Sequence, residues 1–384
     1  MLDASARRTG ASVLAILAGL ALLAAVALLP DLMPSDALPV VGQTSARAVV
    51  RDALPADPTG AARYRVELRD GPDAGATLDA VVQDASAAVP GSATREPYRA
   101  GDEVVVTRFE GEGAAFAVIS DPWRVPLLGL VAALFAAVVL VVGGLRGARS
   151  LVALALTFAV IVKLVVPLLL RGVDPVLLAV GGGIAITVTT LVLTEGPSRV
   201  TLAAVLGTSA ALLLTAVLAA AFTAAAAFST LQGSEEIAFL IPLTGDRLDL
   251  SGILLAATVF GALGVLDDVT VTQAATVEEL HRSDPSARRG AVFAAAMRIG
   301  RSHIAATVNT LMLAYLGVGL PLLLLFALAG QDPLTVLNGE VVAVEVIRAL
   351  VGSIGIVAAV PFTTLVAALL RVPRAPAARG DASA

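Results

Sequence analysis

The chain of 384 residues is 57% hydrophobic and only 15% charged, and its formal net charge is −5. This composition is typical of a multi-pass protein of the lipid bilayer and excludes a chain that is soluble throughout. Cysteine is absent, which excludes disulfides, thiol catalysis and thiolate metal sites. The motifs G-x-x-x-x-G-K-[ST], G-x-S-x-G and H-E-x-x-H are absent as well. We therefore predict no enzyme, no cofactor and no metal site.

The first apolar stretch runs from Ala11 to Leu29, behind Arg7 and Arg8. We interpret residues 1–33 as a cytoplasmic N-terminus and an uncleaved first transmembrane helix. A cleaved signal peptide is the alternative, because a basic start and an apolar centre fit one as well. The apolar run is longer than the usual centre of a signal peptide, which favours the anchor.

Residues 34–122 have the composition of a small soluble domain. Short β-branched or alternating runs are separated there by turn residues such as Asp70-Gly71-Pro72-Asp73. The predicted strands are Ala46–Leu54, Tyr64–Leu68, Thr77–Val82, Glu103–Phe109 and Ala115–Ile119. Five short strands indicate a small extracytoplasmic β-barrel, OB-like in kind. Its aromatic residues are too sparse for stacking nucleic-acid bases, so we expect an envelope protein as its partner and no nucleic acid.

Residues 123–371 contain apolar stretches long enough to cross a bilayer, for which about 20 residues suffice. The predicted spans are Val125–Val142, Leu151–Leu170, Pro175–Thr194, Thr201–Phe228, Gly252–Ala275, Ile304–Ala329 and Val341–Leu370. With the first helix they make a membrane all-α bundle of about eight transmembrane helices. Residues 372–384 are expected to be a disordered cytoplasmic tail.

The distribution of arginine predicts the orientation of these spans. Placing the N-terminus in the cytoplasm puts most loop arginines inside and leaves Arg171 and Arg247 outside. This agrees with the excess of basic residues in cytoplasmic loops. We therefore expect a bacterial cytoplasmic (inner) membrane protein with both termini in the cytoplasm and the β domain outside.

The span from Ser251 to Ala275 carries two adjacent carboxylates, Asp267 and Asp268. A charge at the centre of a membrane costs about 2.5 to 3.5 kcal/mol on insertion scales, so an intramembrane acidic pair indicates a functional site. Gly261, Gly264 and Asp268 share one helical face, where glycines admit a close neighbouring helix. We therefore predict that Asp268 faces the bundle and that Asp267 lies about 100° round the helix from it.

Uncharged and basic residues of other spans are candidates for contact with this pair. Lys163, the single lysine, lies inside an apolar run, and we expect it to reach Asp267 or Asp268. Snorkelling toward the membrane surface is the alternative for Lys163. Thr307, Asn309 and Thr310 are expected at a similar depth as hydrogen-bonding partners of the carboxylates, with interhelical packing as their other role.

Three further features of the last spans have alternative interpretations. Gly317, Gly319 and Pro321 are expected to break or kink their helix, or else to pack closely. Glu345 and Arg348 stand at i and i+3, and we expect them to neutralise each other or to line an outer entrance. Between the spans, Asp284-Pro285-Ser286 is expected to start a basic amphipathic helix, 287–300, that lies on the inner membrane surface.

Two long motifs carry a family resemblance. The run GALGVLDDVTVTQAATVEEL and the run EVIRALVGSIGIVAAVPFTT resemble the YibE/F family of bacterial membrane proteins, over roughly Leu127 to Leu370. This resemblance implies a location in the membrane, but it does not indicate a substrate. A looser similarity, to one half of a resistance-nodulation-division or SecD/SecF-type permease, implies proton flow through Asp267 and Asp268 with Lys163 as counter-cation. The chain departs from those permeases because it has one such half and a much smaller outer domain.

Two functions from different classes are therefore expected. The first is a proton-coupled secondary transporter or export component, in which a homodimer could supply a second half. The second is a non-transporting membrane scaffold whose β domain recruits an envelope or secretion partner. A membrane-embedded enzyme finds little support, since few further polar groups accompany the carboxylates. No residue indicates the substrate.

Overall fold

The computed structural model describes residues 2–30, 32, 43–56, 61–82, 98–111, 114–228 and 249–370. The chain divides into two compact units, of which one is Asp36–Val138 and the other combines Met1–Ser35 with Val139–Ala384. The expected tail, 372–384, lies outside the described residues.

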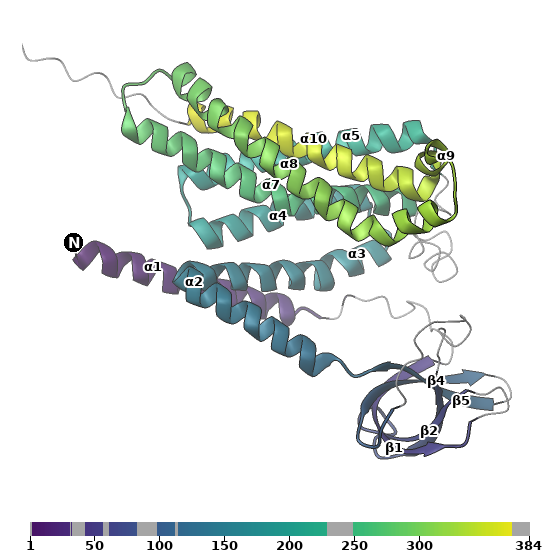
Figure 1. The fold of residues 1–384 in the computed structure, drawn as a ribbon. Coiled ribbons are helices and arrows are strands. Elements are labelled where there is room, and N and C mark those ends of the chain that lie inside the picture. Colours follow the sequence, from purple (N-terminus) through teal and green to yellow (C-terminus); the bar gives the residue numbers. More distant parts are fainter. Residues whose placement is uncertain are drawn as a thin grey trace, which may run out of the picture. The chain divides into compact units, whose positions relative to one another are not determined.

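The unit Asp36–Val138 contains a closed five-strand barrel with the strand order β1-β2-β3-β5-β4. The strands are β1 (Gln43–Leu54), β2 (Arg63–Leu68), β3 (Thr77–Val82), β4 (Glu103–Gly111) and β5 (Ala114–Pro122). All neighbours are antiparallel except β3 and β5, which pair in parallel. The barrel-like domain predicted from five alternating runs is thus confirmed (Figure 1).

Alternation of side chains along the strands builds the core of the barrel. Val50, Val66, Val104 and Val106 point inward and are buried, because successive side chains of a strand point to opposite faces. The outward side chains form ion pairs across strands, such as Arg51 with Glu67. The pairing register shifts once between β1 and β2 and once between β4 and β5, and such bulges help a small sheet to curve into a barrel.

The other unit is a bundle of helices, and Figure 1 shows how they lie alongside one another. They are α1 (Leu2–Ala27), α2 (Val125–Val160), a π-helix (Ile161–Val165), α3 (Val166–Leu170), α4 (Pro175–Glu195), α5 (Arg199–Ala226), α7 (Leu250–Ser283), α8 (Arg289–Leu328), α9 (Pro333–Asn338) and α10 (Glu340–Leu369), with the start of α2 in the barrel unit. Within the described residues, seven helical stretches are long and apolar enough to cross a membrane. A helical membrane bundle is therefore confirmed.

One of these seven stretches covers two of the predicted spans. It runs over 46 residues, Val125–Leu170, which would measure about 69 Å as one straight helix, against a hydrocarbon core of about 30 Å. Gly144 interrupts it with non-helical angles, φ 54° and ψ −135°. A Cβ on Gly147 would overlap the Val139 carbonyl oxygen, although residues eight apart in a straight helix stand about 12 Å apart. The chain therefore reverses at Gly144.

Local signals explain where the helices begin. The side chains of Asp174, Ser198 and Asp249 accept hydrogen bonds from backbone amides in the first turns of α4, α5 and α7, as N-cap residues do. Pro175 follows Asp174 at the first helical position, where its missing N–H leaves no hydrogen bond unmade.

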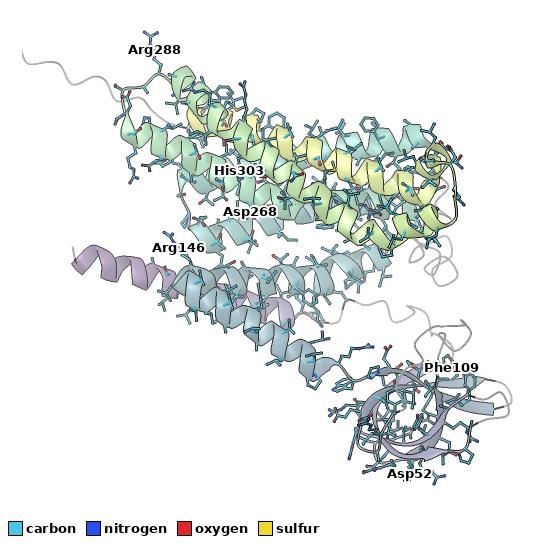
Figure 2. All side chains as sticks on the ribbon, viewed as in Figure 1. Asp52, Phe109, Arg146, Asp268, Arg288 and His303 are labelled. Atoms are coloured by element: carbon cyan, nitrogen blue, oxygen red, sulfur yellow. The ribbon has the colours of Figure 1, made fainter. Side chains whose placement is uncertain are left out.

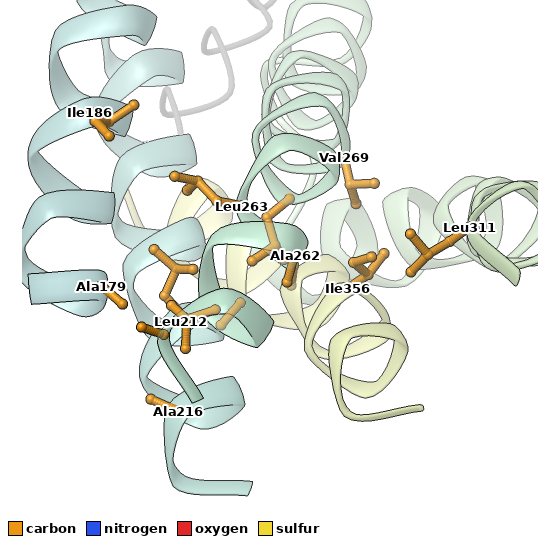
Figure 3. Close-up of a cluster of buried hydrophobic side chains, with 14 of the residues drawn as sticks. Ala179, Ile186, Leu212, Ala216, Ala262, Leu263, Val269, Leu311 and Ile356 are labelled. Carbon is orange, nitrogen blue, oxygen red and sulfur yellow. The ribbon is translucent and has the colours of Figure 1, made fainter. Parts of the chain in front are cut away.

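The α7 helix contributes more buried side chains to the centre of the bundle than any other helix. Ala262, Leu263, Leu266 and Val269 belong to a core cluster with residues of α4, α5, α8 and α10 (Figure 3). The approach of α5 to α10 is close because glycine faces threonine twice: a Cβ on Gly207 would overlap the Thr363 hydroxyl, and one on Gly355 would overlap the Thr215 hydroxyl.

The structure corrects the prediction of a separate basic helix, 287–300, on the membrane surface. Residues 289–300 are the first part of α8, which continues without interruption to Leu328. Val292, Ala296 and Gly300 are buried, and a Cβ on Gly300 would come within 2.6 Å of Val360 on α10. Because these small apolar residues recur every four positions, they form one stripe, and that stripe packs into the bundle instead of lying on a surface.

Candidate functional site

Of the two adjacent carboxylates on α7, Asp267 is the one that engages the bundle. Asp267 is half-buried, and the Thr187 hydroxyl of α4 donates a 3.0 Å hydrogen bond to its Oδ1. Asp268 is exposed. The prediction that Asp268 faces the bundle is therefore wrong. The buried face of α7 runs through Leu266 and Thr270, and Asp267 lies at its edge whereas Asp268 lies beyond it.

Three fully buried threonines from three helices gather at Asp267, and we call them the threonine set: Thr187 of α4, Thr208 of α5 and Thr270 of α7. The hydroxyls of Thr208 and Thr270 are 2.8 Å apart, and Thr270 donates to the Asp267 carbonyl oxygen at 3.1 Å. Asp267 thus has an oxygen-rich shell on its buried side.

Both carboxylates line a pocket of about 640 Å³, which we call the carboxylate pocket. Its polar lining comes from Arg146, Ser150, Thr194, Glu195, Asp267, Asp268, Thr272 and His303. Figure 2 shows that Arg146, Asp268 and His303 come from three different helices. Within the described residues, no group of three or more His, Asp or Glu side chains is placed to hold a metal ion.

Lys163 does not join the carboxylates. It lies in the π-helix and is half-buried, and no ion pair links it to Asp267 or Asp268 in the described part of the chain. The carboxylate pocket is lined instead by Arg146. Because Lys163 stands seventeen positions after Arg146 on the same helical stretch, their backbones are about 25 Å apart. The expected contact is therefore wrong.

The polar residues of the Asn309 span also point elsewhere. The Thr307 hydroxyl donates to the His303 carbonyl and the Thr310 hydroxyl to the Ala306 carbonyl, both within α8. Asn309 is exposed. The residue that α8 contributes to the carboxylate pocket is His303, one turn before Thr307.

Of the glycines expected to mediate close packing or a break, Gly261 alone has a close neighbour. A Cβ at Gly264, Gly317 or Gly319 would meet no atom within 4 Å, and one at Gly261 would come within 3.3 Å of the Tyr315 hydroxyl. Pro321 lies inside α8, which remains helical to Leu328. The predicted close neighbour of α7 is therefore present at Gly261 and absent at Gly264, and α8 is not broken at Gly317, Gly319 or Pro321.

The i, i+3 pair of α10 is formed as expected, since Arg348 donates to Glu345 at 2.8 Å. Glu345 also lines a smaller, mainly apolar pocket of about 240 Å³ between α8 and α10, together with Tyr315, Gly319 and leucines of α8. The role of this pair at an outer entrance stays a prediction.

Sequence reasoning missed the threonine set, Arg146, Glu195 and His303. Threonine is common in membrane helices as a packing residue, so nothing in the sequence distinguishes Thr187 from Thr189 or Thr190. Arg146 and Glu195 lie at helix ends, where charged residues are ordinary. Their convergence on Asp267 results from the packing of α2, α4 and α7.

A family model described as YibE/F-like protein matches residues 131–372, which is more than half of the chain and includes the carboxylate pocket. No curated protein matches the chain. No solved structure matches it either. The looser resemblance to a resistance-nodulation-division or SecD/SecF-type permease is not confirmed.

Proposed function

The chain belongs to the YibE/F-like family, and we propose that this multi-pass membrane protein is a proton-coupled secondary transporter or export component. Asp267 and Asp268 bind and release the coupling protons. The carboxylate pocket leads from the helix ends at Arg146 and Glu195 to Asp267 and is the path for those protons. We place the protein in the bacterial inner membrane, with the pocket opening toward the cytoplasm.

The observation that carries this proposal is a half-buried carboxylate within a membrane helix that has no ion pair among the described residues. A charge buried in a low-dielectric region must be paired or neutralised. A proton neutralises it with the least rearrangement. Asp267 therefore has reason to exchange protons with the water of the carboxylate pocket.

Protonation would change the contact between α4 and α7. The hydrogen bond from Thr187 to Asp267 joins these helices, and a hydrogen bond to a charged acceptor is stronger than one to a neutral group. A proton on Asp267 therefore weakens the link and favours a second arrangement of the two helices. A two-state element biased by a local charge is the general basis of such switches.

Infrared difference spectra of the purified protein, recorded against pH, test the proposal without a substrate. We expect a carboxyl stretching band that appears on acidification in the wild type and is lost in Asp267→Asn. Asp268→Asn is the matched control on the neighbouring position, and the Asp267 band should persist in it. Superimposable titrations of wild type and Asp267→Asn would contradict the proposal.

A second function is favoured by one feature of the barrel. Phe116 is 56% exposed and stacks on Phe109 with ring centroids 4.8 Å apart, and exposed aromatics are typical of protein interfaces. The strand order and the parallel β3–β5 pair support an OB-like barrel. In this alternative the chain is a scaffold that recruits an envelope partner. Deletion of residues 34–122 would then abolish function while Asp267→Asn leaves it intact.

A further inference from the structure

The carboxylate pocket is lined by charges of both signs that do not pair with one another. Its cation is Arg146 of α2, and its carboxylates are those of Glu195 on α4 and of Asp267 and Asp268 on α7. Figure 2 shows Arg146 and Asp268 on separate helices. Within the part of the chain that the structure describes, no ion pair involves any of these four residues. The guanidinium and the carboxylates are therefore held apart around one pocket.

Several other arginines of the described chain do pair with a carboxylate. Examples are Arg51 with Glu67 in the barrel, Arg282 with Glu279 at the end of α7, and Arg348 with Glu345 on α10. Each of these pairs lies on one helix or on neighbouring strands. In the carboxylate pocket the opposite charges come from different helices, so the packing of the bundle sets their separation. A bound molecule that carries both signs of charge would connect them.

The size and the lining of the pocket suit a small molecule with charged ends and an aliphatic part. Its volume of about 640 Å³ lies within the range of about 300–1,000 Å³ that is typical of ligand sites. Hydroxyl groups and an apolar wall accompany the charges, and they belong to Ser150, Thr194 and Thr272 and to Val139, Leu191 and Val271. The hydroxyls can donate or accept hydrogen bonds, and the apolar wall can pack against methylene groups.

We propose that the carboxylate pocket binds an amino acid with a basic side chain, such as lysine or arginine, as the transported substrate. This inference rests on the proposed function, because it assigns a substrate to the pocket that carries the coupling protons. Arg146 binds the carboxylate of the substrate, since a guanidinium can hold a carboxylate through two parallel hydrogen bonds. The two cationic groups of the substrate bind Asp268 and Glu195.

The balance of charge favours a basic amino acid over other small molecules. With His303 of α8 neutral, three carboxylates and one guanidinium give the pocket a formal charge of −2. A basic amino acid brings one net positive charge at neutral pH, and a coupling proton on Asp267 brings the second, so no net charge is left within the membrane. A neutral amino acid leaves one carboxylate unmatched, an acidic one is repelled, and a diamine leaves Arg146 without a partner.

Binding of radioactive L-lysine to the full-length purified protein tests the inference. At about pH 7, where free carboxylates are ionised and amino groups of lysine are protonated, we expect saturable binding of one molecule per chain. Unlabelled L-arginine should displace it, whereas L-glutamate and L-leucine should not. Displacement by L-glutamate or L-leucine as effective as by L-arginine would overturn the assignment to basic amino acids.

Cadaverine, which is lysine without its carboxylate, isolates the role of Arg146. Arg146→Gln should weaken lysine binding at least about tenfold, because a charge-assisted contact with the substrate carboxylate is lost. Radioactive cadaverine should bind the wild type more weakly than lysine does, and Arg146→Gln should not weaken it further. Retained cadaverine binding also shows that the variant is folded. Asp268→Asn should weaken the binding of both molecules.

Arg298→Gln is the matched control, because Arg298 is an exposed arginine of α8 outside the pocket, and lysine binding should be unchanged in it. Absence of saturable lysine binding by the wild type overturns the inference, as does equal lysine binding by wild type and Arg146→Gln. Cadaverine binding to the wild type as tight as that of lysine would overturn the role of a substrate carboxylate.

This outcome is separable from that of the proposed function. If the infrared band of Asp267 titrates but lysine does not bind, proton coupling stands and the substrate assignment fails. If lysine binds through Arg146 but no carboxyl band titrates, the binding site stands and its coupling to protons fails.

Discussion

At the scale of single residues, the environment of a side chain decides its role more than its type does. Asp267 and Asp268 are chemically identical neighbours, yet Asp267 accepts a hydrogen bond from Thr187 and Asp268 is exposed. The reason is the rotation of about 100° between successive helix positions, which places one at the edge of the buried face and the other outside it.

Gln273 is expected to stabilise the bundle. It is buried two turns after Asp267, and its amide donates to the Ala296 carbonyl of α8 at 3.1 Å and to the Thr364 hydroxyl of α10 at 2.7 Å. Gln273→Leu keeps the volume and removes both bonds, so we expect a loss of about 1 to 3 kcal/mol in the free energy of unfolding. Chemical unfolding in detergent measures this loss.

Thr276→Ala is the control for Gln273, because its hydroxyl bonds the Thr272 carbonyl of its own helix. We expect a change within about 0.5 kcal/mol. Equal stability of Gln273→Leu and wild type would show that the two bonds do not hold α7 to its neighbours.

Glu67 is expected to make the stability of the barrel depend on pH. The hydrogen bond from Arg51 holds the pKa of Glu67 below its usual value. Because the folded pKa is the lower one, this stabilisation is fully present above the unfolded pKa of about 4.3 and is lost as pH falls through the folded pKa. Glu67→Gln should therefore be less stable than wild type at about pH 7, and the difference should shrink as the pH falls below about 4.3.

The fluorescence of Trp123, the single tryptophan of the chain, reports unfolding of the barrel in this comparison. Its ring lies under the Arg47 guanidinium, 5.2 Å from the centroid, and will be released when the strands separate. A stability difference between Glu67→Gln and wild type that does not shrink on acidification would contradict the assignment.

At the scale of elements, backbone proximity at glycine determines which helices meet. The two contacts of α5 with α10 are reciprocal, since Gly207 faces Thr363 and Gly355 faces Thr215. Both helices thus carry one glycine and one threonine to the crossing, eight positions apart. Small residues allow such approaches, and packing in a membrane relies on them because water does not drive helices together.

Gly207→Ala is expected to destabilise the bundle by about 1 to 3 kcal/mol, because the added methyl group overlaps the Thr363 hydroxyl and forces the helices apart. The cost should fall when Thr363→Ala removes that hydroxyl, which a double-mutant cycle in detergent measures. Gly181→Ala on α4, where a Cβ would meet no atom within 4 Å, should be neutral or stabilising. Equal effects at Gly207 and Gly181 would argue against a tight crossing of α5 and α10.

At the scale of the whole molecule, charge on the loops and the absence of cysteine allow the proposed orientation to be measured. Ala74 lies exposed in a turn of the barrel, and Ser286 lies exposed between α7 and α8. We expect the first outside the cell membrane and the second in the cytoplasm, since the Arg-rich loop favours the cytoplasmic side.

Single cysteines introduced as Ala74→Cys and Ser286→Cys therefore report topology on a background without cysteine. A maleimide that cannot cross the membrane should label Ala74→Cys in cells that have lost the layers outside an intact cytoplasmic membrane. It should label Ser286→Cys only after that membrane is permeabilised. The opposite labelling pattern would show that the orientation is the reverse of the proposed one and that the carboxylate pocket opens to the outside.

The amino-acid sequence by itself determined most of the elements of this protein. The apolar runs placed the helices and the alternating runs placed the strands, because both patterns record local burial along one element. The sequence also marked Asp267 and Asp268, since a charge within an apolar run is costly wherever it lies. It further indicated the Glu345–Arg348 pair, which is local to one helix.

Only the tertiary structure decided which side chains surround the acidic pair. Thr187, Thr208 and Arg146 reach the site from α4, α5 and α2, and their nearest sequence neighbours look equally suitable. The expected partners Lys163 and Asn309 do not contact the pair. Lys163 lies too far along its own helical stretch, and Asn309 lies on an exposed side of α8. Contacts between helices depend on crossing, depth and rotation, which involve all the packed surfaces at once, so no local pattern in the chain specifies them.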